Sequence, residues 1–81
     1  MNKNEFILWE MVNQQAMGLK GNIIVALDAY TRRTRLDANL VEVNEADLNG
    51  EAIECIGFEV KAVKTVLPGT LLVGRSENGT N

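Results

Sequence analysis

Residues 56 to 74 read IGFEVKAVKTVLPGTLLVG, and this stretch carries the clearest structural pattern in the chain. The only proline of the chain, Pro68, is followed at once by Gly69. Proline presets φ at the second position of a type II turn, and glycine accepts the positive φ that the third position requires. We therefore predict a type II turn over residues 67–70 and a final strand over residues 70–75.

The sequence before this turn contains a change in apolar alternation. The apolar positions before Gly57 are odd-numbered, as at Ile53, whereas those after it are even-numbered, as at Phe58 and Val60. Side chains along a strand alternate with a period of two, so one extra residue at the glycine would produce such a shift. The pattern predicts a strand over residues 51–66, with a β-bulge or sharp bend at Gly57, that returns through the turn into the last strand.

The N-terminal sequence favours a helix over about residues 2–17. Asn2 with Glu5 three residues later fits the asparagine variant of a capping box, and Gly18 is a natural C-terminal cap. One face of this helix would carry apolar residues at helical spacing: Leu8, Met11, Val12, Ala16 and Leu19.

The middle of the chain favours strands. Residues 22–30, NIIVALDAY, are rich in β-branched and aromatic residues, which predicts a central strand. Residues 35–43 alternate well enough for a second strand, although a helix also fits their spacing. Asn44 fits the cap of a single helical turn that ends at Gly50.

Together these segments predict an α+β fold in one domain, residues 1–81. An N-terminal helix is followed by a mainly antiparallel sheet of four to five strands. The strands are expected at about residues 22–30, 35–43, 51–66 and 70–75. So short a chain leaves a thin margin of stability, and such domains often gain stability from disulfides, metals or oligomerisation.

Composition excludes a disulfide within the chain and argues against a zinc site. Cys55 is the only cysteine and the chain has no histidine, so we expect no disulfide and no metal site. Oligomerisation remains, and 46% apolar residues are enough for a core and a subunit interface. We therefore expect a homo-oligomer or a protein partner.

The location follows from similar observations. No apolar run approaches the roughly 20 residues that span a bilayer, so no membrane partner is expected. The N-terminus lacks the basic start and uninterrupted apolar run of a signal peptide. With one unpaired cysteine, these features predict a cytoplasmic protein.

The sequence also argues against an enzyme. It has no histidine to act as a base near neutral pH, and its glycines form no phosphate-binding loop. Cys55 lies in an apolar segment without a partner base and is expected to be a buried structural thiol. We predict no catalytic residues and no cofactor.

Two groups of residues are candidates for binding. The stretch YTRRTR places Tyr30 beside Arg32, Arg33 and Arg35, a pattern that suits phosphate or nucleic-acid contact. In a chain of net charge −3 the stretch is more simply a solvated turn, so nucleic-acid binding is the alternative and is not favoured. The second group comprises the predicted interface residues: Phe6, Trp9 and Met11.

The opening stretch resembles a segment near the C-terminus of tailed-phage major capsid proteins. The matching residues are Gly57, Val60, Leu67, Pro68, Gly69, Thr70, Leu72, Val73 and Gly74. Capsid proteins of this family are several times longer, and Arg75 and Ser76 replace the aspartate and aromatic residue that commonly follow the final glycine. The resemblance implies a structural, self-associating protein of phage or prophage origin, located in the cytoplasm or in the virion.

Overall fold

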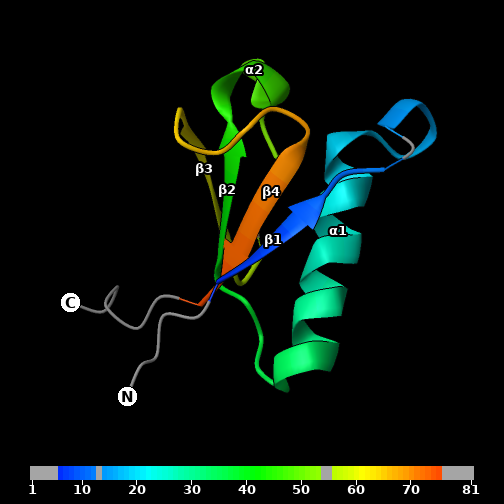
Figure 1. The fold of residues 1–81 in the computed structure, drawn as a ribbon, viewed down its shortest axis with the longest axis vertical. Coiled ribbons are helices and arrows are strands. Elements are labelled where there is room, and N and C mark those ends of the chain that lie inside the picture. The colour runs from blue at the N-terminus through cyan, green and yellow to red at the C-terminus, as the bar shows by residue number, and fades with distance from the viewer. Residues whose placement is uncertain (1–5, 13, 54–55, 76–81) are drawn as a thin grey trace.

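The computed structural model describes residues 6–12, 14–53 and 56–75. It is an α+β fold, as predicted, in which one sheet packs against a long helix (Figure 1). The sheet has four strands in the order β1-β4-β2-β3. The elements in chain order are β1 (Phe6–Glu10), α1 (Gln14–Thr34), β2 (Leu40–Asn44), α2 (Glu45–Leu48), β3 (Glu59–Val63) and β4 (Thr70–Gly74).

The sheet is mixed. Strand β4 is antiparallel to both of its neighbours, β1 and β2, whereas β2 and β3 are parallel. The prediction of a strand that returns directly through the turn is therefore wrong, because β2 lies between β3 and β4. The turn at Pro68 and Gly69 connects two strands that do not pair.

The predicted helix at residues 2–17 is wrong over residues 6–10, whereas residues 14–17 are helical as the first residues of α1. Residues 6–10 form strand β1, and the capping box at Asn2 and Glu5 lies outside the described residues. Alternate residues of β1, Ile7 and Trp9, pack against the core. The same apolar run satisfies helical spacing and strand alternation, and pairing with β4 selects the strand.

The predicted strand at residues 22–30 lies instead within α1. Ile23, Ala26 and Tyr30 are spaced three and four residues apart and are all buried. This is the spacing of one helix face, and only that face meets the sheet. Gly18, the predicted helix end, interrupts α1 with a φ of 69°, so a break does occur there and the helix resumes after it.

The other predicted strands are longer than the observed ones. β2 begins only at Leu40 and ends at Asn44, one residue beyond the predicted segment 35–43. β3 occupies only the later part of the predicted strand 51–66, of which residues 54–55 lie outside the described chain. The last strand, predicted at 70–75, is confirmed as β4.

Three local predictions are confirmed. Residues 56–58 form a bend, and Gly57 has a φ of 85°. The amide of Thr70 donates to the carbonyl of Leu67 at 3.2 Å, and Gly69 has a φ of 87°, as a type II turn requires. Asn44 caps α2 by accepting a hydrogen bond from the amide of Ala46 at 2.8 Å.

The connection from β3 to β4 is fixed by the residues around α2. The Asn44 side-chain amide donates to the carbonyl of Val66 at 2.8 Å, and Val66 is buried. Asp47 accepts a hydrogen bond from the amide of Gly69 at 2.7 Å. The carbonyl of Gly69 in turn accepts from the amide of Met11, so one turn residue links α2 to the segment after β1.

We expect Asp47→Ala to lower the free energy of unfolding by about 1.5–3 kcal/mol, because a hydrogen bond to a charged acceptor contributes roughly this amount. Urea denaturation measures the change. Glu51→Ala removes an exposed carboxylate shortly after α2 and should change stability by less than about 0.5 kcal/mol. Equal losses in the two variants would show that the Asp47 hydrogen bond does not stabilise the turn.

Candidate interaction surface

One face of the sheet carries apolar side chains that neither described helix covers. α1 packs on the face formed by Val41, Val43, Leu71 and Val73, and α2 lies at one end of the sheet (Figure 1). On the opposite face, Leu8 of β1 lies beside Leu72 of β4, and Leu72 lies beside Glu42 of β2. We call this surface the open face; its residues are Phe6, Leu8, Glu10, Leu40, Glu42, Asn44, Glu59, Lys61, Val63, Thr70, Leu72 and Gly74.

Leu8 stands out on the open face. Its side chain is 63% exposed although it occupies the middle of a strand. Leu40 and Leu72 are half-buried on the same face. A leucine that is exposed between other apolar residues extends a patch, and extended apolar patches mark interaction sites more often than scattered single residues do.

The two edges of the sheet differ in chemistry. β3, at one edge, has the sequence EVKAV and carries two charges, Glu59 and Lys61. β1, at the other edge, has the sequence FILWE, with four consecutive apolar residues before Glu10. Charged residues, lysine above all, discourage an edge strand from pairing with another chain. β1 lacks that protection over most of its length.

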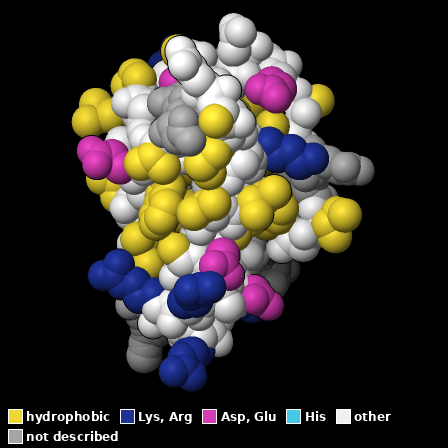
Figure 2. Space-filling model, turned by 90° about the vertical axis from the view of Figure 1, so that its right-hand side faces the viewer, with side chains coloured by type: hydrophobic (Ala, Val, Ile, Leu, Met, Phe, Trp, Pro, Cys, Tyr) yellow, Lys and Arg dark blue, Asp and Glu magenta, His cyan; other side chains and the backbone are white. Residues whose placement is uncertain are grey.

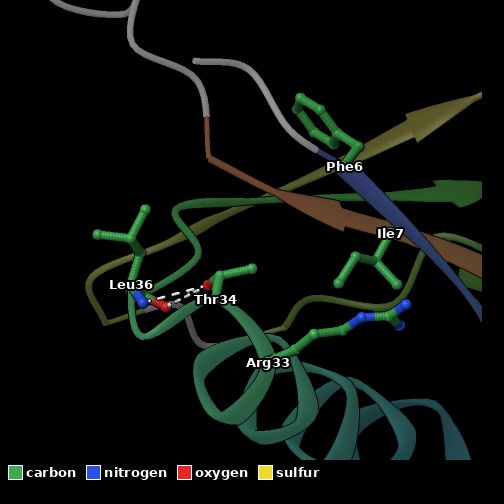
Figure 3. A pocket seen from close by; sticks show the side chains of 5 residues that line it. All are labelled: Phe6, Ile7, Arg33, Thr34 and Leu36. Carbon is green, nitrogen blue, oxygen red and sulfur yellow. Dashed lines mark hydrogen bonds between the residues drawn. The ribbon is translucent and has the colours of Figure 1, made fainter. Parts of the chain in front are cut away.

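A hollow of about 460 Å³ lies between the start of β1 and the end of α1. It is lined by Phe6, Ile7, Arg33, Thr34 and Leu36, and Figure 3 shows the Arg33 side chain reaching towards Ile7. The Thr34 hydroxyl is already engaged, since it donates to the carbonyl of Tyr30 and accepts from the amide of Leu36. Arg33 makes no ion pair with any described residue. It therefore places a positive charge beside the edge strand.

The structure separates the residues of the YTRRTR stretch. Tyr30 is 1% exposed, so its ring is not available to stack on a base. Arg32 forms an exposed ion pair with Asp28 at 3.1 Å. Arg35 has a φ of 65° and its amide donates to the carbonyl of Thr31, which ends the helix. The stretch is thus the last turn of α1, where basic residues favour the negative end of the helix dipole.

The predicted interface residues are also separated. Met11 is buried in the core and is not available to a partner. Trp9 is half-buried against the core, and its Nε1 is buried without a hydrogen-bond partner in the described part of the chain. Phe6 belongs to the open face. Leu8 is not among the interface residues predicted from helical spacing. A period of two in FILWE would have placed its side chain on the face of the strand opposite Ile7 and Trp9.

A second apolar region lies on the α1 side of the molecule. Hydrophobic side chains form a band across this side, with basic side chains at one end of it (Figure 2). A hollow of about 210 Å³ there is lined by Ile24 of α1 and by Ile56, which is 84% exposed. The other lining residues are Lys20, Ile23, Ile53 and Phe58. An adjoining hollow shares Ile56 and Phe58.

Two further features were searched for in the described ranges: metal-binding clusters and membrane-spanning helices. No three His, Cys, Asp or Glu side chains come together to form a group that could hold a metal ion within residues 6–12, 14–53 and 56–75. Within the same ranges, no helix has the length and apolar character needed to cross a bilayer.

Comparison of the chain with known protein families, curated proteins and solved structures found no match.

Proposed function

We propose that this chain is a non-enzymatic structural protein that works by associating with copies of itself. The observation that carries the proposal is the exposure of Leu8 in the middle of β1, on a face of the sheet that neither described helix covers. Antiparallel sheets with one solvated face normally carry polar residues there. Leu8, which lies on the edge strand of this face, is the residue that contact with a second subunit would bury.

The size of the chain supports the same proposal. A domain of 81 residues buries only about 60% of the surface that its unfolded chain exposes, which leaves little stability in reserve. Burial of apolar surface contributes roughly 25 cal/mol per Å², so burying apolar residues of β1 against a second subunit would add stability that the single chain lacks. Association would stabilise the fold by mass action.

We further propose a role in the assembly or the particle of a phage or prophage. The segment that resembles major capsid proteins, residues 56–74, contains β3, the type II turn and β4. β4 is an interior strand that contributes Leu72 to the open face. The identity of the neighbouring genes tests this role, since a phage structural cluster would support it and an unrelated operon would contradict it.

We expect Leu8→Lys to convert an oligomer into a monomer, because it places a charge in the middle of the apolar patch. Sedimentation velocity over a hundredfold range of protein concentration measures the mass. Leu67→Lys is the matched control, because Leu67 is 70% exposed but belongs to the turn before β4. A wild-type protein that remains monomeric throughout, or a Leu8→Lys variant that associates as strongly as the wild type, would contradict the proposal.

A further inference from the structure

We propose that two copies pair through their β1 strands, antiparallel and about a two-fold axis, so that two four-stranded sheets form one sheet of eight strands. This inference rests on the proposed self-association and specifies its geometry. The partner is a second copy of this chain. The contact is made by the backbone of the edge strand as well as by apolar side chains.

Strand β1 is the edge suited to such pairing. An edge strand presents backbone N–H and C=O groups that have no partner on its outer side. Among the described strands, β1 pairs only with β4, so its other side is an edge of the sheet. The residues Phe6 to Trp9 of β1 are apolar, so burying them costs no desolvation of charge. Pairing through the other edge, β3, would cost free energy because Glu59 and Lys61 would lose their contact with water.

The register follows from the length of the strand. β1 has five residues, and only the pairing centred on Leu8 uses all of them. In this register Leu8 lies opposite the partner's Leu8, and Ile7 lies opposite the partner's Trp9. Even-numbered residues of β1 then lie opposite even-numbered residues of the partner, so the open faces of both copies form one continuous surface. The odd-numbered residues Ile7 and Trp9 remain on the α1 side.

Disulfide cross-linking tests the register. The variant carries Leu8→Cys with Cys55→Ser, so that the introduced thiol is the only one. Opposed Cα atoms in an antiparallel pair lie about 4.5–5.5 Å apart, within the range that a disulfide spans. The control carries Leu72→Cys with Cys55→Ser, on the adjacent strand of the same face. Three strand spacings, about 14 Å, would separate its two thiols, too far for a disulfide.

We expect mild oxidation to give a covalent dimer at least tenfold faster with Leu8→Cys than with Leu72→Cys. If the wild-type protein associates but the two cysteine variants cross-link at equal rates, edge pairing is overturned. Stacked open faces would then be favoured, and the proposed self-association would remain. A monomeric wild-type protein would contradict the proposed function itself, and with it this inference.

Discussion

Substitution of Asn22 by leucine is expected to lower the free energy of unfolding by about 3 kcal/mol. Asn22 is fully buried and fixes the connection between β1 and α1. Its Oδ1 accepts from the amide of Val12 at 2.9 Å, and its Nδ2 donates to the carbonyls of Val12 and Gly18 at 3.0 Å each. Leucine has a similar volume but leaves these backbone groups without a partner, and each such group costs roughly 1–3 kcal/mol.

This loss is large for so small a chain, because stability of about 0.05–0.15 kcal/mol per residue gives roughly 4–12 kcal/mol in total. Urea denaturation followed by circular dichroism measures it. Asn22→Asp keeps the acceptor but turns a carboxylate oxygen towards two carbonyls, so it should destabilise the fold at least as much. Gln15→Ala removes an exposed amide from the same helix and is the control. A loss below about 1 kcal/mol in Asn22→Leu would show that the buried amide does not hold this connection.

Two adjacent leucines on β4 should respond very differently to truncation. Leu71 is fully buried on the face that α1 covers, between Trp9 of β1 and Val43 of β2. Leu71→Ala is expected to lower the free energy of unfolding by about 3–5 kcal/mol, since such a change loses transfer free energy and leaves a cavity. Leu72→Ala, on the open face, should lower it by about 1 kcal/mol or less in the monomer.

The comparison is best made in the Leu8→Lys background, where association is expected to be absent and the monomer alone is measured. Chemical denaturation gives both losses under the same conditions. In the background with Leu8 intact, Leu72→Ala should additionally weaken association, whereas Leu71→Ala should act on folding. If both leucines proved equally costly in the monomer, the open face would have to be covered by the chain itself.

Prediction of the binding residues was limited by the prediction of secondary structure. Helical spacing predicts Phe6, Trp9 and Met11 as interface residues, but Phe6 and Trp9 lie on opposite faces of strand β1 and Met11 is buried just after it. Adjacency in sequence predicts that Tyr30 and the arginines share one contact surface. The burial of Tyr30 follows from its place on the inner face of α1, one turn after Ala26, which adjacency in sequence does not reveal.

Local sequence determined the features that depend on a few neighbouring residues. The turn at Pro68 and Gly69, the bend at Gly57 and the cap at Asn44 each need a particular residue type at a particular backbone angle or hydrogen bond. These requirements are satisfied within about four residues, so they can be recognised without knowledge of the fold.

Only the tertiary structure decided which apolar segments are strands and which are helical. Residues 6–10 and 22–30 both contain long apolar runs that satisfy a period of two and a period of 3.6. Their intrinsic preferences differ by too little to choose between the two, and the choice is made by the surfaces that they bury. Residues 6–10 gain backbone hydrogen bonds by pairing with β4, while Ile23, Ala26 and Tyr30 gain burial by packing as one helix face on the sheet. The strand order, with β2 between β3 and β4, likewise depends on contacts between segments far apart in the chain.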